Sequence, residues 1–246
     1  RKTITLIVAA PLAAAVSGTL FWRWVSNRQE RPCPPWLTIL LENPYMRAVA
    51  SAESILARLD LGPGMRILDA GCGPGRLTIP AAQSLGAAGH VTALDIQPEM
   101  LRRVQERAAE SRCHNITYLQ QGLGAGALPA NSFDRALLVT VLGEVPQKEA
   151  ALAEIYTALK PGGILSITEV LPDPHYQIYS TVRRLAVQAG FEPGKKWRNG
   201  LAYTAHFLKP DQGKLSVAQL GAIAETLVLP LYYRARESER PDALIR

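Results

Sequence analysis

Cysteine is scarce in this chain, which has three among its 246 residues: Cys33, Cys72 and Cys113. A disulfide framework needs more cysteines, and a thiolate metal site needs them at short spacings. The sequence therefore predicts neither a disulfide framework nor a metal site. We interpret the three as reduced thiols in a cytosolic compartment.

The chain also lacks a continuous basic stripe, although its formal net charge is +6. Its basic residues are scattered, with pairs such as Arg102-Arg103 and Arg183-Arg184 far apart in the sequence. Only 7% of the residues are aromatic, and none of them alternate with basic residues. This pattern disfavours nucleic acid as a partner, whereas the positive charge suits an anionic membrane surface.

Charge is absent from residues 3–22, which are long enough to cross a bilayer as a helix. Arg23, Arg28 and Arg31 follow, and Trp22 and Trp24 stand at the expected interface. We predict a single-pass anchor over residues 1–25, with the rest of the chain facing the cytosol. A cleaved signal peptide and a buried helix of the fold are the alternatives.

The remainder alternates between strand and helix patterns, which indicates a doubly wound α/β sheet. Residues 26–60 form a proline-rich linker and N-terminal helices, residues 61–210 the domain, and residues 211–246 a C-terminal helical extension. The expected strands are 66–69, 90–95, 115–120, 133–141 and 164–170, with a final hairpin from 191–193 and 201–208. The expected helices are 36–59, 77–85, 98–111, 148–159 and 179–189.

One run is more informative than the rest: an apolar strand ends in Asp69, and Gly71, Gly73 and Gly75 follow at alternate positions. Glycines here let the backbone turn and let a ligand lie against bare peptide groups. Two interpretations compete, a dinucleotide-binding turn and an S-adenosylmethionine (SAM) turn. The dinucleotide fingerprint needs a glycine three positions after its second, where this chain has Arg76. The spacing therefore favours SAM.

The chain resembles the class I SAM-dependent methyltransferases over roughly residues 61–210. The resemblance rests on LDAGCGPGRLT, VTALDIQPEML, LPANSFD and ALKPGGILSITE. Among these enzymes it is most similar to the small-molecule methyltransferases of ubiquinone and menaquinone biosynthesis. The resemblance implies a Rossmann-like, seven-stranded sheet whose last strand is antiparallel. It also implies a cytosolic cofactor, which favours a retained anchor over an exported chain.

The resemblance assigns the cofactor contacts residue by residue. The three glycines would approach SAM through their backbone, and Asp69 would hold the methionine ammonium group directly or through water. Asp95, at the end of the second strand, would bind the ribose hydroxyls, although an acid there also serves dinucleotide enzymes or caps a helix. The remaining predicted cofactor residues are Ile96, Gly122, Leu123 and Thr140.

One departure concerns the adenine. Similar enzymes place an acid after the third strand, where this chain has Gln121-Gly122-Leu123. The adenine amino group would therefore lack its usual carboxylate. Weaker SAM binding is an expected consequence.

Methyl transfer needs alignment and, for a protonated nucleophile, a base. Groups after the fourth and fifth strands should supply it. His175 is the first candidate because its unperturbed pKa lies near neutrality, and Glu144 is the second. Glu144 follows Gly143, where related enzymes often carry histidine. Glu169, Asp173 and Tyr176 share the predicted region, and each candidate has a surface or capping role as its alternative.

The predicted function is SAM-dependent methylation of a small lipophilic acceptor, quinone-like or lipid, by a membrane-anchored enzyme. The Asn/Asp-Pro-Pro-Tyr motif of nucleic-acid amino methyltransferases is absent, which disfavours nucleic acid as the acceptor. Two alternatives remain: a non-catalytic membrane protein with this fold, and a nicotinamide-dependent oxidoreductase. The sequence does not determine the oligomeric state.

Overall fold

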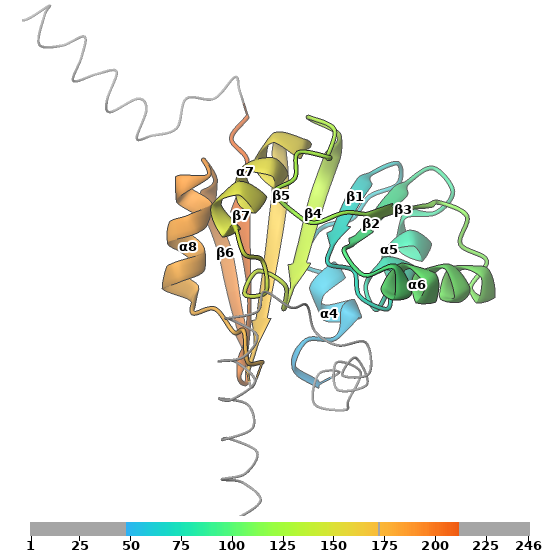
Figure 1. Cartoon of the computed structure of the whole chain (residues 1–246), viewed down its shortest axis with the longest axis horizontal. Helices are drawn as coiled ribbons and strands as arrows, with labels where there is room; N and C mark the ends of the chain where they lie inside the picture. Colours follow the sequence, from blue (N-terminus) through green and yellow to red (C-terminus); the bar gives the residue numbers. More distant parts are fainter. Residues whose placement is uncertain (1–47, 172, 212–246) are drawn as a thin grey trace, which may run out of the picture. The chain divides into compact units, whose positions relative to one another are not determined.

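The computed structural model describes residues 48–171 and 173–211 (Figure 1). The expected anchor, most of the expected N-terminal helices and the C-terminal extension lie outside these residues. The described strands are β1 (Arg66–Ala70), β2 (His90–Asp95), β3 (Ile116–Gln120), β4 (Phe133–Val139), β5 (Leu159–Val170), β6 (Glu192–Asn199) and β7 (Ala202–Leu208). The described helices are α4 (Ala52–Leu56), α5 (Thr78–Leu85), α6 (Pro98–Glu110), α7 (Lys148–Ala158) and α8 (Tyr179–Gln188).

The strands form one seven-stranded sheet in the order β3-β2-β1-β4-β5-β7-β6 (Figure 1). β1 to β5 pair in parallel, and β7 pairs antiparallel with both β5 and β6. The predicted seven-stranded sheet with an antiparallel last strand is therefore confirmed. The strand order reverses between β1 and β4, which is where open α/β sheets bind their ligands.

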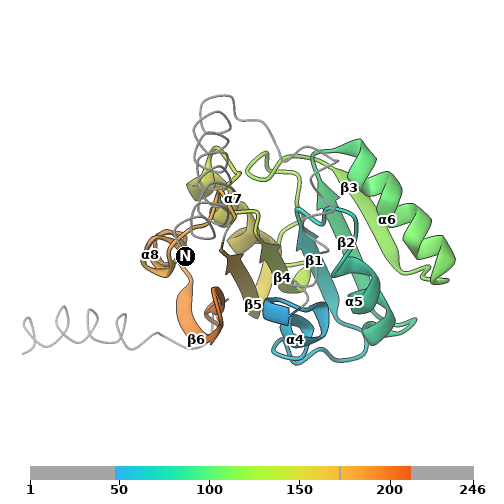
Figure 2. The same ribbon diagram turned by 90° about the horizontal axis from the view of Figure 1, so that it is seen from below.

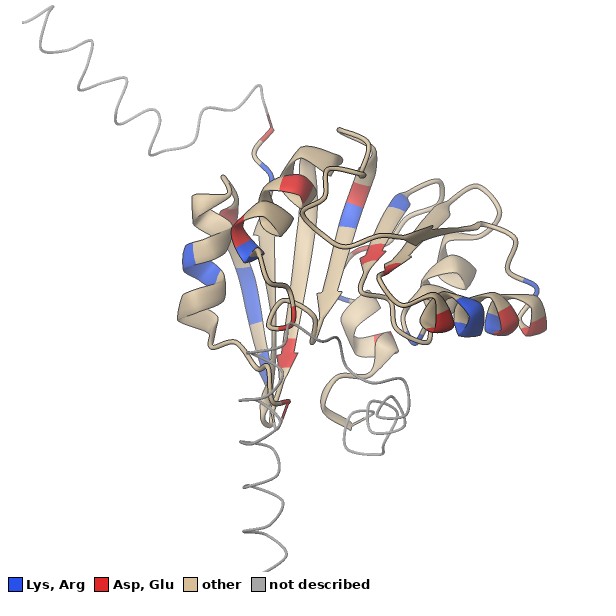
Figure 3. Ribbon diagram, viewed as in Figure 1, with Lys and Arg blue, Asp and Glu red and all other residues tan. Residues whose placement is uncertain are grey.

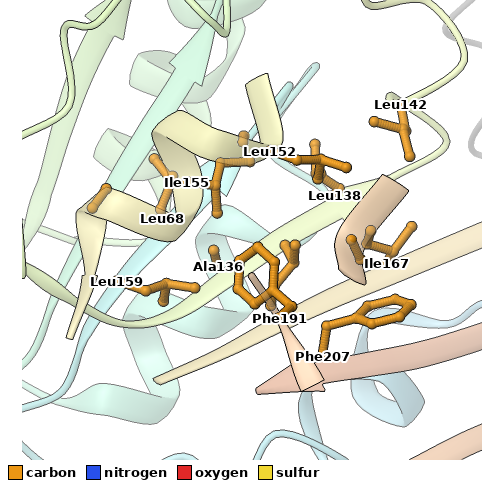
Figure 4. Close-up of a cluster of buried hydrophobic side chains, with 14 of the residues drawn as sticks. Leu68, Ala136, Leu138, Leu142, Leu152, Ile155, Leu159, Ile167, Phe191 and Phe207 are labelled. Atoms are coloured by element: carbon orange, nitrogen blue, oxygen red, sulfur yellow. The ribbon is translucent and has the colours of Figure 1, made fainter. Parts of the chain in front are cut away.

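Helices cover both faces of the sheet, which is why the central strands are apolar on both sides (Figure 2). On one face α7 and α8 pack against β4, β5 and β7, through side chains such as Leu138, Leu152, Ile155 and Phe207 (Figure 4). On the other face α4 and α5 cover β1 and β4, and α6 lies over β2 and β3. This double layer holds the strand ends, and the loops that follow them, in place.

Three boundaries differ from the sequence expectation. β4 ends at Val139, two residues early, because Thr140 has a φ of +56°, which a strand cannot contain. β5 begins at Leu159, since the expected turn at 160–163 is a bulge within the strand and not a break before it. β6 continues to Asn199 and had been expected only over 191–193, because its exposed side chains show no hydrophobic alternation.

The described end of the N-terminal region also differs from the expected continuous helix. α4 spans only five residues and is capped by Ser51, whose Oγ accepts a hydrogen bond from the Ser54 N–H at 3.1 Å. Just before it, the Asn199 side chain donates to the backbone oxygens of Ala48 and Val49 at 3.0 and 3.1 Å. The chain therefore enters the domain beside the β6–β7 turn.

Charges of both signs are distributed over the described surface (Figure 3). On α6, Arg102 pairs with both Glu99 and Glu106, and Arg103 also pairs with Glu99. Basic residues on α6 are therefore interleaved with acidic ones. No described helix is both long and apolar enough to cross a membrane.

Candidate functional site

A pocket opens at the carboxyl ends of β1, β2, β3 and β4, at the position where the strand order reverses. Its floor is the glycine turn after β1, and its walls are the loops after the other three strands. The lining residues are Gly71, Gly73, Leu94, Asp95, Ile96, Gln97, Met100, Gln121, Gly122, Leu123, Val139, Thr140, Val141, Glu144, Val145 and Pro146.

The glycine turn divides its work among its three glycines. Gly71 has a φ of +71°, and a Cβ there would lie 2.5 Å from a methyl carbon of Val141, so only glycine fits. Gly73 faces open space, so its bare backbone is available to a ligand. Gly75 lies against Val104 of α6, where a Cβ would approach to 3.2 Å, and it does not line the pocket. The structure therefore places Gly71 and Gly73 in the site and Gly75 beneath it.

Asp95 lies in the pocket wall, 7% exposed, at the end of β2. Its two carboxylate oxygens accept the Gly73 N–H and the Gln97 N–H, each at 2.9 Å. Burial raises the pKa of Asp95, while these hydrogen bonds act in the opposite direction. Gln97 is the N-cap of α6, so Asp95 binds the capping residue and is not the cap itself. A carboxylate has about four lone-pair sites, which leaves room for two ribose hydroxyls.

Asp69 lies deeper, 3% exposed, and is not among the residues that line the pocket. The Thr78 hydroxyl donates to its Oδ2 at 2.6 Å. Burial raises the pKa of Asp69 to about 6, although this hydrogen bond opposes the shift. The structure therefore favours contact with a ligand ammonium group through water over direct contact.

The loop after β3 forms the wall opposite the glycine turn. Gln121, Gly122 and Leu123 line it, and Ile96, which is 56% exposed, faces the same opening. Glu154 of α7 holds this loop by accepting the Gly124 N–H at 2.5 Å and the Leu128 N–H at 3.1 Å. An apolar slot with backbone groups results, without a carboxylate at the position where the sequence analysis noted its absence.

The two base candidates are placed differently. Glu144 lines the pocket, and it does not cap α7, whose N-cap is Gln147. His175 is 9% exposed and is not among the lining residues; its N–H donates to Asp173 Oδ1 at 2.7 Å. A Cβ on Gly143 would lie 1.9 Å from the His175 carbonyl oxygen. The loop after β5 thus rests on the loop after β4, and the space that a histidine at position 143 would fill is occupied.

Comparison with known proteins points to one activity. Residues 67–163 match a family described as a methyltransferase domain. A ubiquinone/menaquinone biosynthesis C-methyltransferase of Shewanella pealeana is 35% identical over 125 residues, which is 48% of this chain and 50% of that protein. A demethylmenaquinone methyltransferase of Listeria monocytogenes is 36% identical over 103 residues, or 42% and 44%. The chain spans about half the length of the curated relatives it matches.

Solved structures share the fold. A SAM-dependent methyltransferase from Aquifex aeolicus aligns with a TM-score of 0.66 and 22% identity, over 72% of this chain and 99% of that one. Phosphoethanolamine N-methyltransferase 2 of Haemonchus contortus, with S-adenosylhomocysteine, aligns with a TM-score of 0.55 and 19% identity, over 65% and 52%. The chain contains a SAM-dependent methyltransferase domain.

The pocket of this methyltransferase domain fits SAM by its own geometry. The bare backbone at Gly73 admits a close ligand, and Asp95 offers a carboxylate 7% exposed at the pocket wall. The slot at Gly122 and Leu123 offers apolar surface and backbone groups to a flat base. Arg76, which stands where the dinucleotide fingerprint needs glycine, donates to the Ala50 oxygen at 2.5 Å.

Several residues of the methyltransferase domain's site had no signal in the sequence. Met100, Val145 and Pro146 line the pocket, but their sequence pattern is that of ordinary helix and loop residues. Glu154 holds the adenine-side loop from 26 and 30 residues away, a distance that no local pattern reveals. The contact between Gly143 and His175 depends on two loops of different strands.

Proposed function

We propose that this chain is a SAM-dependent methyltransferase whose acceptor is small and lipophilic, a quinone-like ring or a lipid. One observation carries the proposal. The Gly73 backbone, the Asp95 carboxylate and the Glu144 side chain line a single pocket at the point where the strand order reverses. The two relatives named for quinone biosynthesis support the acceptor class.

When bound, SAM supplies a methyl group on a positively charged sulfur. The chain's own residues bind, orient and deprotonate. Asp95 would accept hydrogen bonds from the ribose hydroxyls while its links to Gly73 and Gln97 fix its position. Asp69, through water, would hold the methionine ammonium group. Gly122 and Leu123 would lie along the adenine.

At the acceptor end Glu144 is the base that the geometry favours, because it lines the pocket and His175 does not. It would take the proton from the acceptor's nucleophilic group as the methyl group is transferred. Apolar side chains around it, including Val141 and Val145, would surround the acceptor and keep water away from the reacting atoms.

The membrane location belongs to this proposal as well. The uncharged residues 3–22, followed by Arg23, Arg28 and Arg31, would hold the domain on the cytosolic side of a bilayer. An acceptor dissolved in that bilayer would then have a short path to the carboxyl edge of the sheet.

The test is incubation of the full chain with methyl-labelled SAM and a membrane lipid extract. Label in an organic-phase product, lost in Asp95→Ala and reduced in Glu144→Gln, is the expected result. Matched variants at the exposed Glu149 and Asp60 should retain it. SAM binding without label in any product would instead indicate a non-catalytic protein.

A further inference from the structure

Glu169 lies at the carboxyl end of β5 and is only 1% exposed. The register of the two strands pairs Val139 of β4 with Thr168 of β5, and the Thr140 N–H donates to the Thr168 oxygen at 2.9 Å. Glu169 is therefore the neighbour of Thr140, which lines the pocket. This carboxyl group lies at the acceptor end of the site, on the strand beyond the pocket wall.

The two oxygens of this carboxyl group differ. Oε2 accepts the Gln177 N–H at 3.1 Å. Oε1 is fully buried and has no hydrogen-bond partner among the described residues. A buried polar atom without a partner costs free energy, so folded proteins rarely keep one without a use.

The surroundings of Glu169 favour its neutral form. Burial raises the pKa of Glu169 to about 8, and the carboxylates of Asp173 and Glu144 act in the same direction. The Gln177 N–H and the Lys148 ammonium group act against this shift. The other titratable groups close by are Tyr176 in the loop after β5 and Tyr203 on β7, and the Glu169 charge helps to raise the pKa of both.

A neutral carboxyl group has one proton, and the hydrogen bonds decide which oxygen holds it. Because Oε2 accepts the Gln177 N–H, the free position for the proton is Oε1. Oε1 is then a hydrogen-bond donor that faces no protein acceptor. A group of this kind binds an oxygen atom and not an ammonium group.

We propose that Glu169 recognises the methyl acceptor by donating a hydrogen bond from Oε1 to an oxygen atom that the acceptor carries. The inference rests on the proposed function, because it assumes that an acceptor occupies the space beside Thr140 and Glu144. It narrows the acceptor to a molecule with a carbonyl, ether or hydroxyl oxygen near the atom that is methylated.

A purely structural role for Glu169 is the competing explanation. The loop after β5 is held at Gln177, whose N–H binds Glu169 and whose oxygen accepts the Tyr203 hydroxyl at 2.7 Å. Glu169 could therefore serve only to fix this loop. That role would not depend on whether a ligand carries an oxygen atom.

The test compares two ligands of nearly equal shape, 1-tetralone, which has one carbonyl oxygen, and tetralin, which has none. Neither ionises, and binding of each to the full chain saturated with S-adenosylhomocysteine is measured by calorimetry. Wild type should bind 1-tetralone at least fivefold more tightly at pH 7. Glu169→Met should abolish this preference, and Glu169→Gln, whose amide can still donate, should keep it. Glu192→Gln, on the exposed strand β6, is the matched control.

The pH dependence gives a second readout that does not need the methionine variant to fold. Above pH 8 the wild-type carboxyl group ionises and loses its donor, so its preference for 1-tetralone should disappear by pH 9.5. Glu169→Gln should keep its preference across the same range. Absence of the preference in wild type, its survival in Glu169→Met, or a pH profile shared by wild type and Glu169→Gln would each overturn the inference.

These outcomes are separate from failure of the proposed function. Binding of the two ligands is measured without turnover, whereas the proposed function fails when no labelled product forms from SAM and membrane lipids. A parallel loss of S-adenosylhomocysteine affinity in both Glu169 variants would assign the residue to loop support and also overturn the inference.

Discussion

Buried carboxyl groups dominate the site at the scale of single residues. Asp69, Asp95 and Glu169 are each less than 10% exposed, and each has a pKa raised mainly by burial. A raised carboxyl pKa means that the folded chain holds a proton that the unfolded chain has released. Stability therefore falls as pH rises from the unfolded pKa to the folded one. These residues cost stability near neutral pH and supply charge or hydrogen bonds to ligands.

Asp69→Asn tests this cost. At pH 7.5 the variant should have a higher Tm, since it removes a penalty on the order of 3 kcal/mol and its amide oxygen can still accept the Thr78 hydroxyl. The gain should be complete above pH 6 and shrink towards pH 4, where both forms are uncharged. Thermal unfolding across this range checks it. SAM affinity should fall in the same variant, and in wild type it should fall as pH drops below 6.

Gly143 gives a steric prediction. Gly143→Ala should destabilise the chain by about 1–3 kcal/mol, because its Cβ would lie 1.9 Å from the His175 oxygen and the loop after β5 must move. Urea unfolding measures the change. Gly62→Ala is the control, since its Cβ would meet only Met65 at an ordinary 3.6 Å. Equal stability of the two variants would contradict the packing of the two loops.

At the scale of elements, the sheet was predictable and the loop contacts were not. The alternation of apolar strands with amphipathic helices predicts five parallel strands and their order of use, because buried strands and half-buried helices have different periods. Local patterns also found the Asp69 to Gly75 turn and Asp95. They could not find Glu154 or the contact of Gly143 with His175, since these depend on residues 26 or more positions apart.

Strand ends were also beyond the sequence. Thr140 adopts a left-handed backbone conformation that a β-branched residue rarely takes, and its letter gives no sign of it. β6 is a polar edge strand, whose lysines protect an exposed edge and hide the alternation that a pattern search needs. Both features lie where the fold, and not local propensity, determines the backbone.

The link between α7 and the loop after β3 gives a prediction for an element. Glu154→Ala should weaken SAM binding severalfold, because the Gly124 and Leu128 N–H groups lose their acceptor and the adenine-side wall loosens. Calorimetry measures the affinity, and thermal unfolding shows that α7 remains folded. Glu149→Ala, exposed on the same helix, should leave affinity unchanged. Equal affinity in both variants would show that the wall does not depend on Glu154.

At the scale of the whole molecule, the proposal joins a SAM pocket to a membrane. Deletion of residues 1–31 should sharply reduce turnover on an acceptor embedded in vesicles and leave turnover on a short-chain soluble analogue nearly unchanged. The reason is that the uncharged segment 3–22 would bring the domain to its acceptor. Parallel assays of both substrates measure it. Equal loss on both substrates would mean that the N-terminal segment supports folding and not access.

The central claim is that SAM binds in the pocket between the β1 turn and Asp95. The most direct measurement is calorimetric titration of the full chain, wild type and Asp95→Ala, with SAM and separately with NAD. The account predicts that wild type binds SAM and does not bind NAD. It also predicts that Asp95→Ala weakens SAM binding at least tenfold, because charge-assisted hydrogen bonds to the ribose are worth about 1.5–3 kcal/mol each. Tight NAD binding, or SAM binding unchanged by Asp95→Ala, would contradict it.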